Sequence, residues 1–189
     1  MKNILLFASG GGSNVRAILD YFEARTDVNF PLILTNKASA GVVDMARERG
    51  MDVLLLSKGV FQSDVFLDTI DYFQPDLLVL AGFLWKIPEY LIQAYPHKII
   101  NIHPSLLPKY GGKGMYGSYV HTAVLANRET ESGMTIHLVN ERYDEGTILL
   151  QKSLQIAPDE TPATLASRVL ELEHQWYPRV IENLIEAPE

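Results

Sequence analysis

The stretch Ile4-Leu5-Leu6-Phe7-Ala8-Ser9-Gly10-Gly11-Gly12-Ser13-Asn14 joins a short apolar run to three consecutive glycines. Five apolar residues in a row predict a strand that is buried on both of its faces. From Asn14 to Ala24, apolar side chains recur at the spacing of a helix. The stripe that they form consists of Val15, Ile18, Leu19 and Phe22. The chain is therefore predicted to begin with a strand, a glycine turn and a helix, which is the first unit of an α/β fold.

The same alternation continues through the first half of the chain. Strands are predicted at Pro31–Thr35, Val53–Leu56, Leu77–Ala81 and Lys98–Ile102. Helices are predicted at Val42–Arg49, Val60–Phe73 and Pro88–Ala94. Strands that alternate with helices favour an open, mostly parallel, twisted sheet with helices on both faces. The first half is therefore expected to be Rossmann-like.

The second half has a different pattern, in which a Gly- and Pro-rich stretch is followed by a helix, two strands and a long last helix. These segments are Pro104–Gly117, Ser118–Asn127, Gly133–Val139, Thr147–Gln155 and Pro162–Ile185. No repeat, low-complexity tract or linker separates the two halves. We therefore expect one domain that spans residues 1–189.

The composition is that of a globular protein, with 47% hydrophobic and 21% charged residues. The absence of cysteine excludes a disulfide framework, a thiolate nucleophile and a cysteine-ligated metal. A formal net charge of -7 argues against a broad nucleic-acid surface. The segment Met1–Ala8 is too short for the core of a signal peptide, and the longest apolar run, Leu77–Trp85, is about half of a membrane span. We expect a soluble, cytoplasmic protein with no nucleic-acid or membrane partner.

The glycine loop between the first strand and the first helix has the features of a phosphate site. Glycine lets the backbone approach a ligand closely, and the amides at a helix N-terminus suit an anion. The alternative is a tight turn in which Ser13 or Asn14 caps the helix. A dinucleotide site is disfavoured, because Val15 replaces the third glycine of its fingerprint and Thr35-Asn36-Lys37 offers no carboxylate for a ribose. A monophosphate fits the loop better.

Asn101 and His103 lie two residues apart at the carboxyl end of a predicted strand, which is the edge of such sheets where ligands bind. Pro104 favours an extended conformation at His103, so both side chains are expected on one face. An amide can hold a developing oxyanion, and an imidazole can move a proton near neutral pH. The alternative is that the pair satisfies local backbone groups. Asp144, within the turn signal Asp144-Glu145-Gly146, joins them only if the fold brings it to His103.

The other histidines give no signal of their own, and they are His97, His121, His137 and His174. The run Asn101-Ile102-His103-Pro104-Ser105-Leu106-Leu107-Pro108-Lys109-Tyr110, however, resembles the signature of the folate-dependent formyltransferases. The resemblance is nearly end to end and includes Gly12-Ser13-Asn14, Asn36-Lys37, Leu80-Ala81-Gly82-Phe83, the Asp144 loop and Glu173-His174. The chain as a whole resembles the monofunctional members of that family, which formylate glycinamide ribonucleotide in purine biosynthesis.

The resemblance implies a formyltransferase fold, with a nucleotide-binding half at about 1–100 and a catalytic and folate-binding half at about 101–189. It implies the catalytic set Asn101, His103 and Asp144. It places the ribonucleotide on Gly12, Ser13, Asn14 and Glu173. It places the co-substrate, 10-formyltetrahydrofolate, on Leu84, Trp85, Lys86, Ile87, Asn101, Asn140, Glu141, Arg142, Tyr143 and Asp144. It implies no metal and a monomer or homodimer. An aspartate beside His103 is further expected to raise the pKa of the imidazole.

The chain departs from the family pattern at two points. Members usually carry a basic residue after the third strand, where it meets the folate tail, whereas the nearest counterpart here is Asp64. Lys58 lies nearby, and the tail contact stays unassigned. The loop Gly111–Gly117 is also richer in glycine than the familiar version.

Other functions are weighed against this one. Methionyl-tRNA formyltransferase carries an extra C-terminal domain and a basic surface, and formyltetrahydrofolate hydrolase carries an extra N-terminal domain. We expect neither arrangement here. The alternative to the expected function is another folate-dependent formyltransferase or the hydrolase. A catalytically silent nucleotide- or pterin-binding module would be expected to lack one of Asn101, His103 and Asp144, and all three are present.

Overall fold

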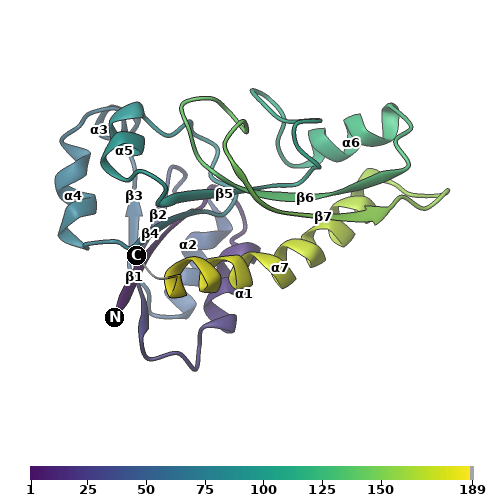
Figure 1. Ribbon diagram of the computed structural model, residues 1–189. Helices are drawn as coiled ribbons and strands as arrows, with labels where there is room; N and C mark the ends of the chain where they lie inside the picture. Colours follow the sequence, from purple (N-terminus) through teal and green to yellow (C-terminus); the bar gives the residue numbers. More distant parts are fainter. Residues whose placement is uncertain (188–189) are drawn as a thin grey trace.

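A seven-stranded sheet in the order β3-β2-β1-β4-β5-β6-β7 runs through the computed structural model, which describes residues 1–187 (Figure 1). The strands are β1 (Lys2–Phe7), β2 (Val28–Thr35), β3 (Val53–Leu55), β4 (Leu77–Leu80), β5 (Ile99–His103), β6 (Glu131–Leu138) and β7 (Ile148–Gln155). The first five strands pair in parallel, in the order of a doubly wound fold, and β6 is antiparallel to both of its neighbours. The expected mostly parallel sheet is confirmed.

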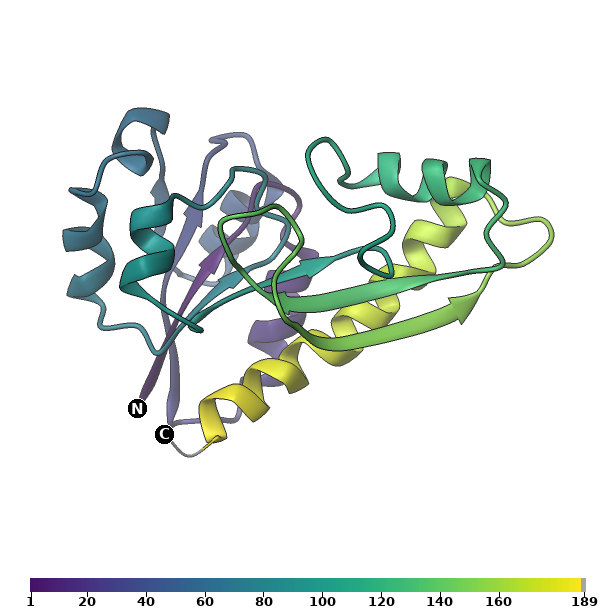
Figure 2. The same ribbon diagram turned by 45° about the horizontal axis from the view of Figure 1, so that its top comes forward.

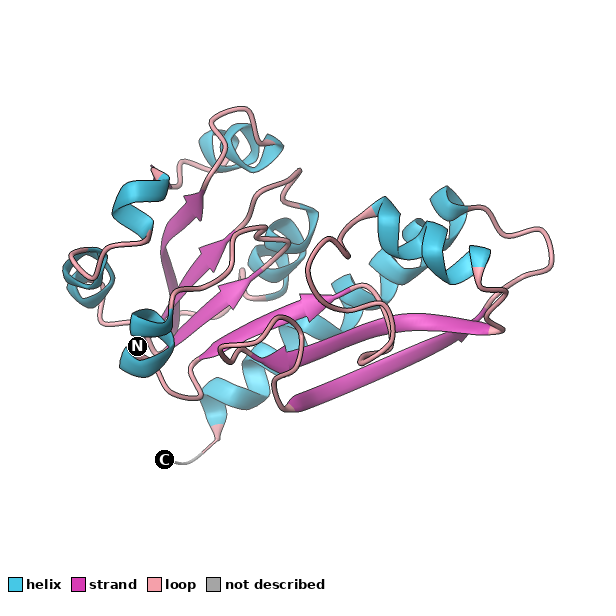
Figure 3. Ribbon diagram, turned by 90° about the horizontal axis from the view of Figure 1, so that it is seen from above, coloured by secondary structure: helices cyan, strands magenta, loops and turns pink. Residues whose placement is uncertain are grey.

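Helices cover both faces of this sheet (Figure 3). They are α1 (Ser13–Tyr21), α2 (Gly41–Glu48), α3 (Lys58–Phe61), α4 (Phe66–Tyr72), α5 (Glu89–Ala94), α6 (Ser118–Ala126) and α7 (Pro162–Glu186). Successive side chains of a strand point to opposite faces. Ile4 and Leu6 of β1 accordingly pack in a core with α1, α2, α6 and α7, and Leu5 and Phe7 pack in a second core with α3, α4 and α5. None of the helices in residues 1–187 combines the length and the apolar character that a bilayer-spanning segment needs.

One predicted helix, Val60–Phe73, is wrong, because the segment forms the two helices α3 and α4 with a break between them. Phe61 and Phe66 are both 1% exposed, and their ring centroids lie 5.6 Å apart. In one continuous helix, positions five residues apart would point about 140° away from each other. Breaking the helix lets both rings enter the same core.

The last helix, α7, runs alongside β6 and β7 and packs on one face of the sheet (Figure 2). Thr161 begins it with a capping box that Thr164 completes. The fully buried hydroxyl of Tyr177 donates to the carbonyl oxygens of Leu80, at 2.9 Å, and Ile100, at 3.3 Å. Since side chains four residues apart share a helix face, Glu173 is directed toward the same region, at the carboxyl ends of β4 and β5.

We predict that Tyr177→Phe lowers the free energy of unfolding by about 1–2 kcal/mol, because two buried carbonyl groups lose a donor. Urea denaturation followed by circular dichroism measures this change. Tyr72→Phe is the matched control, since Tyr72 is 80% exposed and should leave stability unchanged. Equal midpoints for Tyr177→Phe and the wild-type protein would show that these bonds contribute nothing.

Candidate active site

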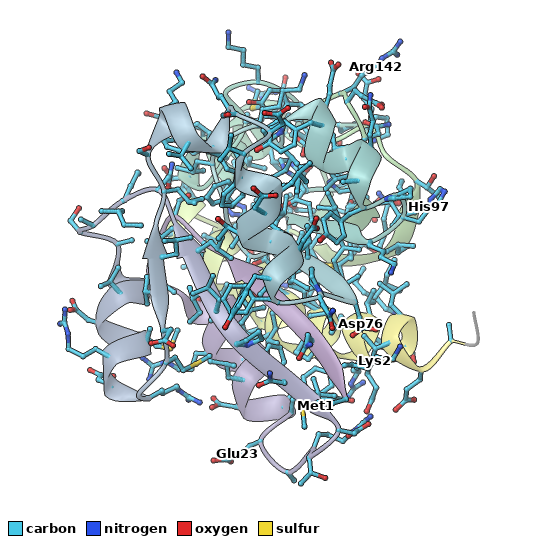
Figure 4. The ribbon with its side chains drawn as sticks, turned by 90° about the vertical axis from the view of Figure 1, so that its left-hand side faces the viewer. Met1, Lys2, Glu23, Asp76, His97 and Arg142 are labelled. Carbon is cyan, nitrogen blue, oxygen red and sulfur yellow. The ribbon has the colours of Figure 1, made fainter. Side chains whose placement is uncertain are left out.

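A cleft of about 980 Å³ opens at the carboxyl ends of β1, β4 and β5. Its walls come from the loops that follow these strands, from the β6–β7 loop and from α7. In Figure 4, Arg142 of the β6–β7 loop lies at the end of the molecule opposite Met1, which immediately precedes β1. The cleft therefore occupies the edge where ligands bind in open α/β sheets.

The structure brings most of the candidate site residues to this cleft. The residues that line it are Asn14, Leu84, Trp85, Lys86, Ile87, Asn101, His103, Asn140, Arg142, Tyr143, Asp144 and Glu173. Gly12 and Ser13 do not line the cleft, although Gly10 and Asn14 on either side of them do; Gly12 is buried and Ser13 is exposed. Glu141 does not line the cleft; it lines a separate hollow of about 290 Å³, which it shares with Asn140.

Asn101 and His103 lie on one face of β5, while Ile100 and Ile102 pack in the core on the other face. The antiparallel pairing of β5 with β6 puts His137 directly opposite Asn101. The ring nitrogen Nδ1 of His137 donates to the Leu138 carbonyl at 2.9 Å. Its Nε2 is left to accept the Asn101 side-chain amide at 3.1 Å. His137 thus belongs to the site, which sequence reasoning missed, since only the register between β5 and β6 reveals it.

Asp144 lies between the two imidazoles. Its Oδ2 is 3.7 Å from Nδ1 of His103, and its Oδ1 is 3.6 Å from Nε2 of His137. The Gly112 amide donates to Oδ2 at 2.8 Å. Asp144 itself has a φ of 57°, in the left-handed region that an L-residue adopts at a cost. The fold therefore unites an amide, two imidazoles and a carboxylate that are far apart in the sequence.

The pKa of His103 shifts in the direction opposite to the expectation. Burial alone would raise the pKa of Asp144, but the nearby His137 and His103 imidazoles, which can carry a positive charge, and the Gly112 amide together lower it. Burial lowers the pKa of His103, and this outweighs the opposite effects of Asp144 and the Tyr110 carbonyl. The expected net rise for His103 was wrong, because burial of the ring could not be judged from the sequence. At neutral pH Asp144 is ionised and His103 is neutral.

The glycine loop leaves the first amides of α1 open. Neither Ser13 nor Asn14 caps the helix; Gly12, with a φ of 78°, is the residue before it, and no side-chain cap is present. A Cβ at Gly12 would lie 2.9 Å from Cγ2 of Val42, so only glycine fits. The first amides of a helix have no partner within it, so this end has donors that suit an anion.

Asn14 also joins the loop to the last helix. Its side-chain amide donates to Oε2 of Glu173 at 2.6 Å, and Glu173 is only 6% exposed. Burial raises the pKa of Glu173 to about 7, although the bond from Asn14 acts in the opposite direction. The cleft therefore has a carboxyl group in its floor that changes charge near neutral pH.

The apolar end of the cleft is built from two loops. The loop after β4 is anchored by the Leu84 amide, which donates to the Ser9 hydroxyl at 2.9 Å, and by the Trp85 ring, which lies 5.5 Å from that of Phe61. Burial and the charge of Asp144 raise the pKa of Tyr143, while a hydrogen bond to the Lys86 backbone lowers it. That contact brings the β6–β7 loop against the loop after β4.

Neither residue considered for the folate tail lines the cleft. Lys58 begins α3, and Asp64 lies between α3 and α4. The tail contact therefore has no assigned residue.

The model of the formyl transferase family matches residues 2–181. The chain belongs to the formyl transferase family. Among its relatives, it is 34% identical over 192 residues to a phosphoribosylglycinamide formyltransferase of Bacillus subtilis, covering 98% of this chain and 95% of that protein. A chloroplastic phosphoribosylglycinamide formyltransferase of Arabidopsis thaliana is 42% identical over 193 residues, with 98% of this chain covered.

The chain spans 66% of the Arabidopsis protein and 61% of a second chloroplastic relative, from Vigna unguiculata, which is less than two thirds of each. Among solved structures of the family, glycinamide ribonucleotide transformylase 1 from Symbiobacterium toebii superposes with a TM-score of 0.88 at 30% identity. That comparison covers 100% of this chain and 91% of the other. The family fold therefore extends over the whole of the sheet and its helices.

We predict that Glu173→Gln stabilises the protein at pH 8 but not at pH 4.5. The pKa of Glu173 is about 7 in the folded protein, against an ordinary value of 4.5, so the wild-type protein loses stability as the pH rises from 4.5 through 7. Glutamine avoids that loss, which amounts to about 3 kcal/mol. Urea unfolding at both pH values measures the difference, and Glu171→Gln, at an exposed position of the same helix, is the control. Identical stabilities at pH 8 would refute the buried carboxyl.

Proposed function

We propose that the protein is an enzyme that transfers the formyl group of 10-formyltetrahydrofolate to the amine of glycinamide ribonucleotide. The observation that carries this proposal is the placement of the Asp144 carboxylate 3.7 Å from His103 and 3.6 Å from His137. Membership of the formyl transferase family and the names of the relatives support the same reaction. The proposed setting is purine biosynthesis.

The proposed binding mode assigns one end of the cleft to each substrate. The free amides of α1 at Gly12, Ser13 and Asn14 suit the ribonucleotide phosphate, and Glu173 offers a carboxyl group for its polar atoms. The two loops around Leu84–Ile87 and Asn140–Asp144 offer the surface for the folate ring. A volume of about 980 Å³ is near the upper end for ligand pockets, in keeping with two substrates bound together.

The proposed chemistry is direct transfer. The free amine attacks the formyl carbon, a new C–N bond forms and the carbonyl oxygen becomes an oxyanion. The Asn101 amide has a second N–H beyond the one that contacts His137, and we assign it to that oxygen. His103 donates a hydrogen bond there only as an imidazolium, because the single hydrogen of its neutral form is on Nε2, which faces the Tyr110 carbonyl. The ionised Asp144 accepts the proton of the attacking amine. The oxyanion then re-forms the carbonyl as the bond between the folate nitrogen and the formyl carbon breaks, and Asp144 returns the proton to that nitrogen through water. No covalent enzyme intermediate is needed.

We predict that Asp144→Asn lowers kcat by about 10²–10⁴-fold, because asparagine cannot accept the proton, while the fold stays intact. The assay follows folate absorbance with both substrates present. Glu145→Gln, at the exposed neighbouring position, is the control and should retain turnover. Full activity in a folded Asp144→Asn protein would contradict the assignment.

We predict that Gly12→Ala raises KM for the ribonucleotide more than KM for the folate. The new methyl group would clash with Val42 and strain a φ of 78°, which displaces the amides of the phosphate site. Gly59→Ala is the matched control, because a Cβ there meets nothing within 4 Å. Equal rises in the two KM values would argue against phosphate binding at this loop.

The experiment that separates this function from the hydrolase alternative adds or omits glycinamide ribonucleotide in the same assay. Turnover that depends on the amine supports transfer, and turnover in its absence supports hydrolysis. The cytoplasmic location, the monomer or homodimer, and the absence of metal and nucleic acid stay predictions. The two plant relatives are named chloroplastic.

A further inference from the structure

Three side chains outside the cleft meet behind His103. Oε1 of Glu129 accepts the Tyr110 hydroxyl at 2.9 Å. The Lys109 amine donates to both carboxylate oxygens of Glu129 at 3.0 Å. None of these three residues lines the cleft. They therefore bind no substrate there, and any effect on the reaction must pass through a residue that does line it.

The link to the cleft is the Tyr110 backbone. The Nε2 atom of His103 lies 2.8 Å from the Tyr110 carbonyl oxygen. A carbonyl can only accept, so Nε2 must carry the hydrogen. In the neutral ring this leaves Nδ1, on the side of Asp144, without a hydrogen. The Tyr110 carbonyl thus determines both the orientation of the ring and the nitrogen that is protonated.

The Tyr110 backbone adopts an unfavourable conformation where it presents this carbonyl to His103. Its φ is 56°, which costs about 1–2 kcal/mol for a residue with a side chain. Such a conformation persists only where neighbouring groups hold it. On one side, the Ser105 hydroxyl donates to the Lys109 carbonyl at 2.7 Å. On the other, Glu129 holds the Tyr110 side chain.

Glu129 is itself fixed by the end of α6. Arg128 has a φ of 53°, and the Glu129 amide donates to the Val124 carbonyl at 3.3 Å. Hydrogen bonds from Lys109 and Tyr110 lower the pKa of Glu129, so the carboxylate is ionised at neutral pH. The chain thus leaves the site after Tyr110, passes through the glycine-rich loop 111–117 and α6, and returns at Glu129, which binds the Tyr110 side chain.

We propose that Glu129 is a positioning residue that fixes the orientation and the protonated nitrogen of His103 through the Tyr110 carbonyl. The kinetic part of this inference rests on the proposed formyl transfer. Because surface ion pairs contribute little to stability, variants of this cluster should fold normally.

The test compares two phenol–carboxylate pairs in the same protein. Tyr110→Phe removes the hydroxyl that binds Glu129, and Glu129→Ala removes the carboxylate. Tyr21→Phe is the matched control, because the Tyr21 hydroxyl donates to Glu182, which also binds Arg25, on the outer side of α1 and α7. The control removes the same kind of bond far from His103.

Both site variants should lose about tenfold in kcat, with the KM values of both substrates within about twofold of the wild-type values. The double variant should be no slower than the slower single variant, because both changes break one chain of contacts. Tyr21→Phe should keep the wild-type kcat. Wild-type kcat in both site variants, losses that add in the double variant, or an equal loss in Tyr21→Phe would each overturn the proposal.

A second measurement needs no substrate. Long-range ¹H–¹⁵N spectra of protein labelled on histidine report which ring nitrogen carries the hydrogen, and His103→Gln assigns the signals. His103 should show hydrogen on Nε2 in the wild-type protein and in Tyr21→Phe, and a mixture of both tautomers in the two site variants. An unchanged pattern in Tyr110→Phe and Glu129→Ala would overturn the proposal. If the wild-type protein transfers no formyl group, the proposed function fails while this measurement still decides the positioning role.

Discussion

The cleft depends on the placement of the Asp144 carboxylate, which is 11% exposed and lies between His103 and His137. A buried charge is costly unless other groups stabilise it. Here the Gly112 amide donates to the carboxylate, and two imidazoles, which can become positively charged, lie 3.7 Å and 3.6 Å from it. This requirement reaches into the neighbouring loop. A Cβ at Gly111 would lie 2.6 Å from the Leu107 side chain and 3.2 Å from Cβ of Asp144. Position 111 therefore needs a glycine, because the backbone there comes close to Asp144 and leaves no room for a side chain.

The site lies where the parallel part of the sheet meets the antiparallel part. The parallel strands supply the glycine loop, the helix amides of α1 and the loop after β4, as doubly wound sheets commonly do. The antiparallel strand β6 supplies His137 opposite Asn101 and then turns into the loop that carries Asp144. The antiparallel strand thus places His137 and the Asp144 loop beside Asn101 and His103 of the last parallel strand.

Much of this architecture could be predicted from the sequence, and the exceptions have physical reasons. The strands of the first half follow from apolar runs, and the shared face of Asn101 and His103 follows from their spacing. The break between α3 and α4 could not be predicted in this way, because it depends on Phe61 and Phe66 packing in the same core, which is a tertiary contact. Asp144 came from family resemblance alone, since a turn signal contains no information about its distant neighbours. The lowered pKa of His103 depends on burial, which is a property of the folded chain.

The bond between Asn14 and Glu173 connects residues 159 positions apart in the sequence. Asn14 belongs to the first helix, whereas its carboxyl partner belongs to the last one. During synthesis, a ribosome-bound chain acquires the loop early but lacks the floor of the cleft until α7 docks. Under the proposed function, the ribonucleotide site is therefore complete only after α7 has docked, so that chains without α7 have little means of sequestering the metabolite.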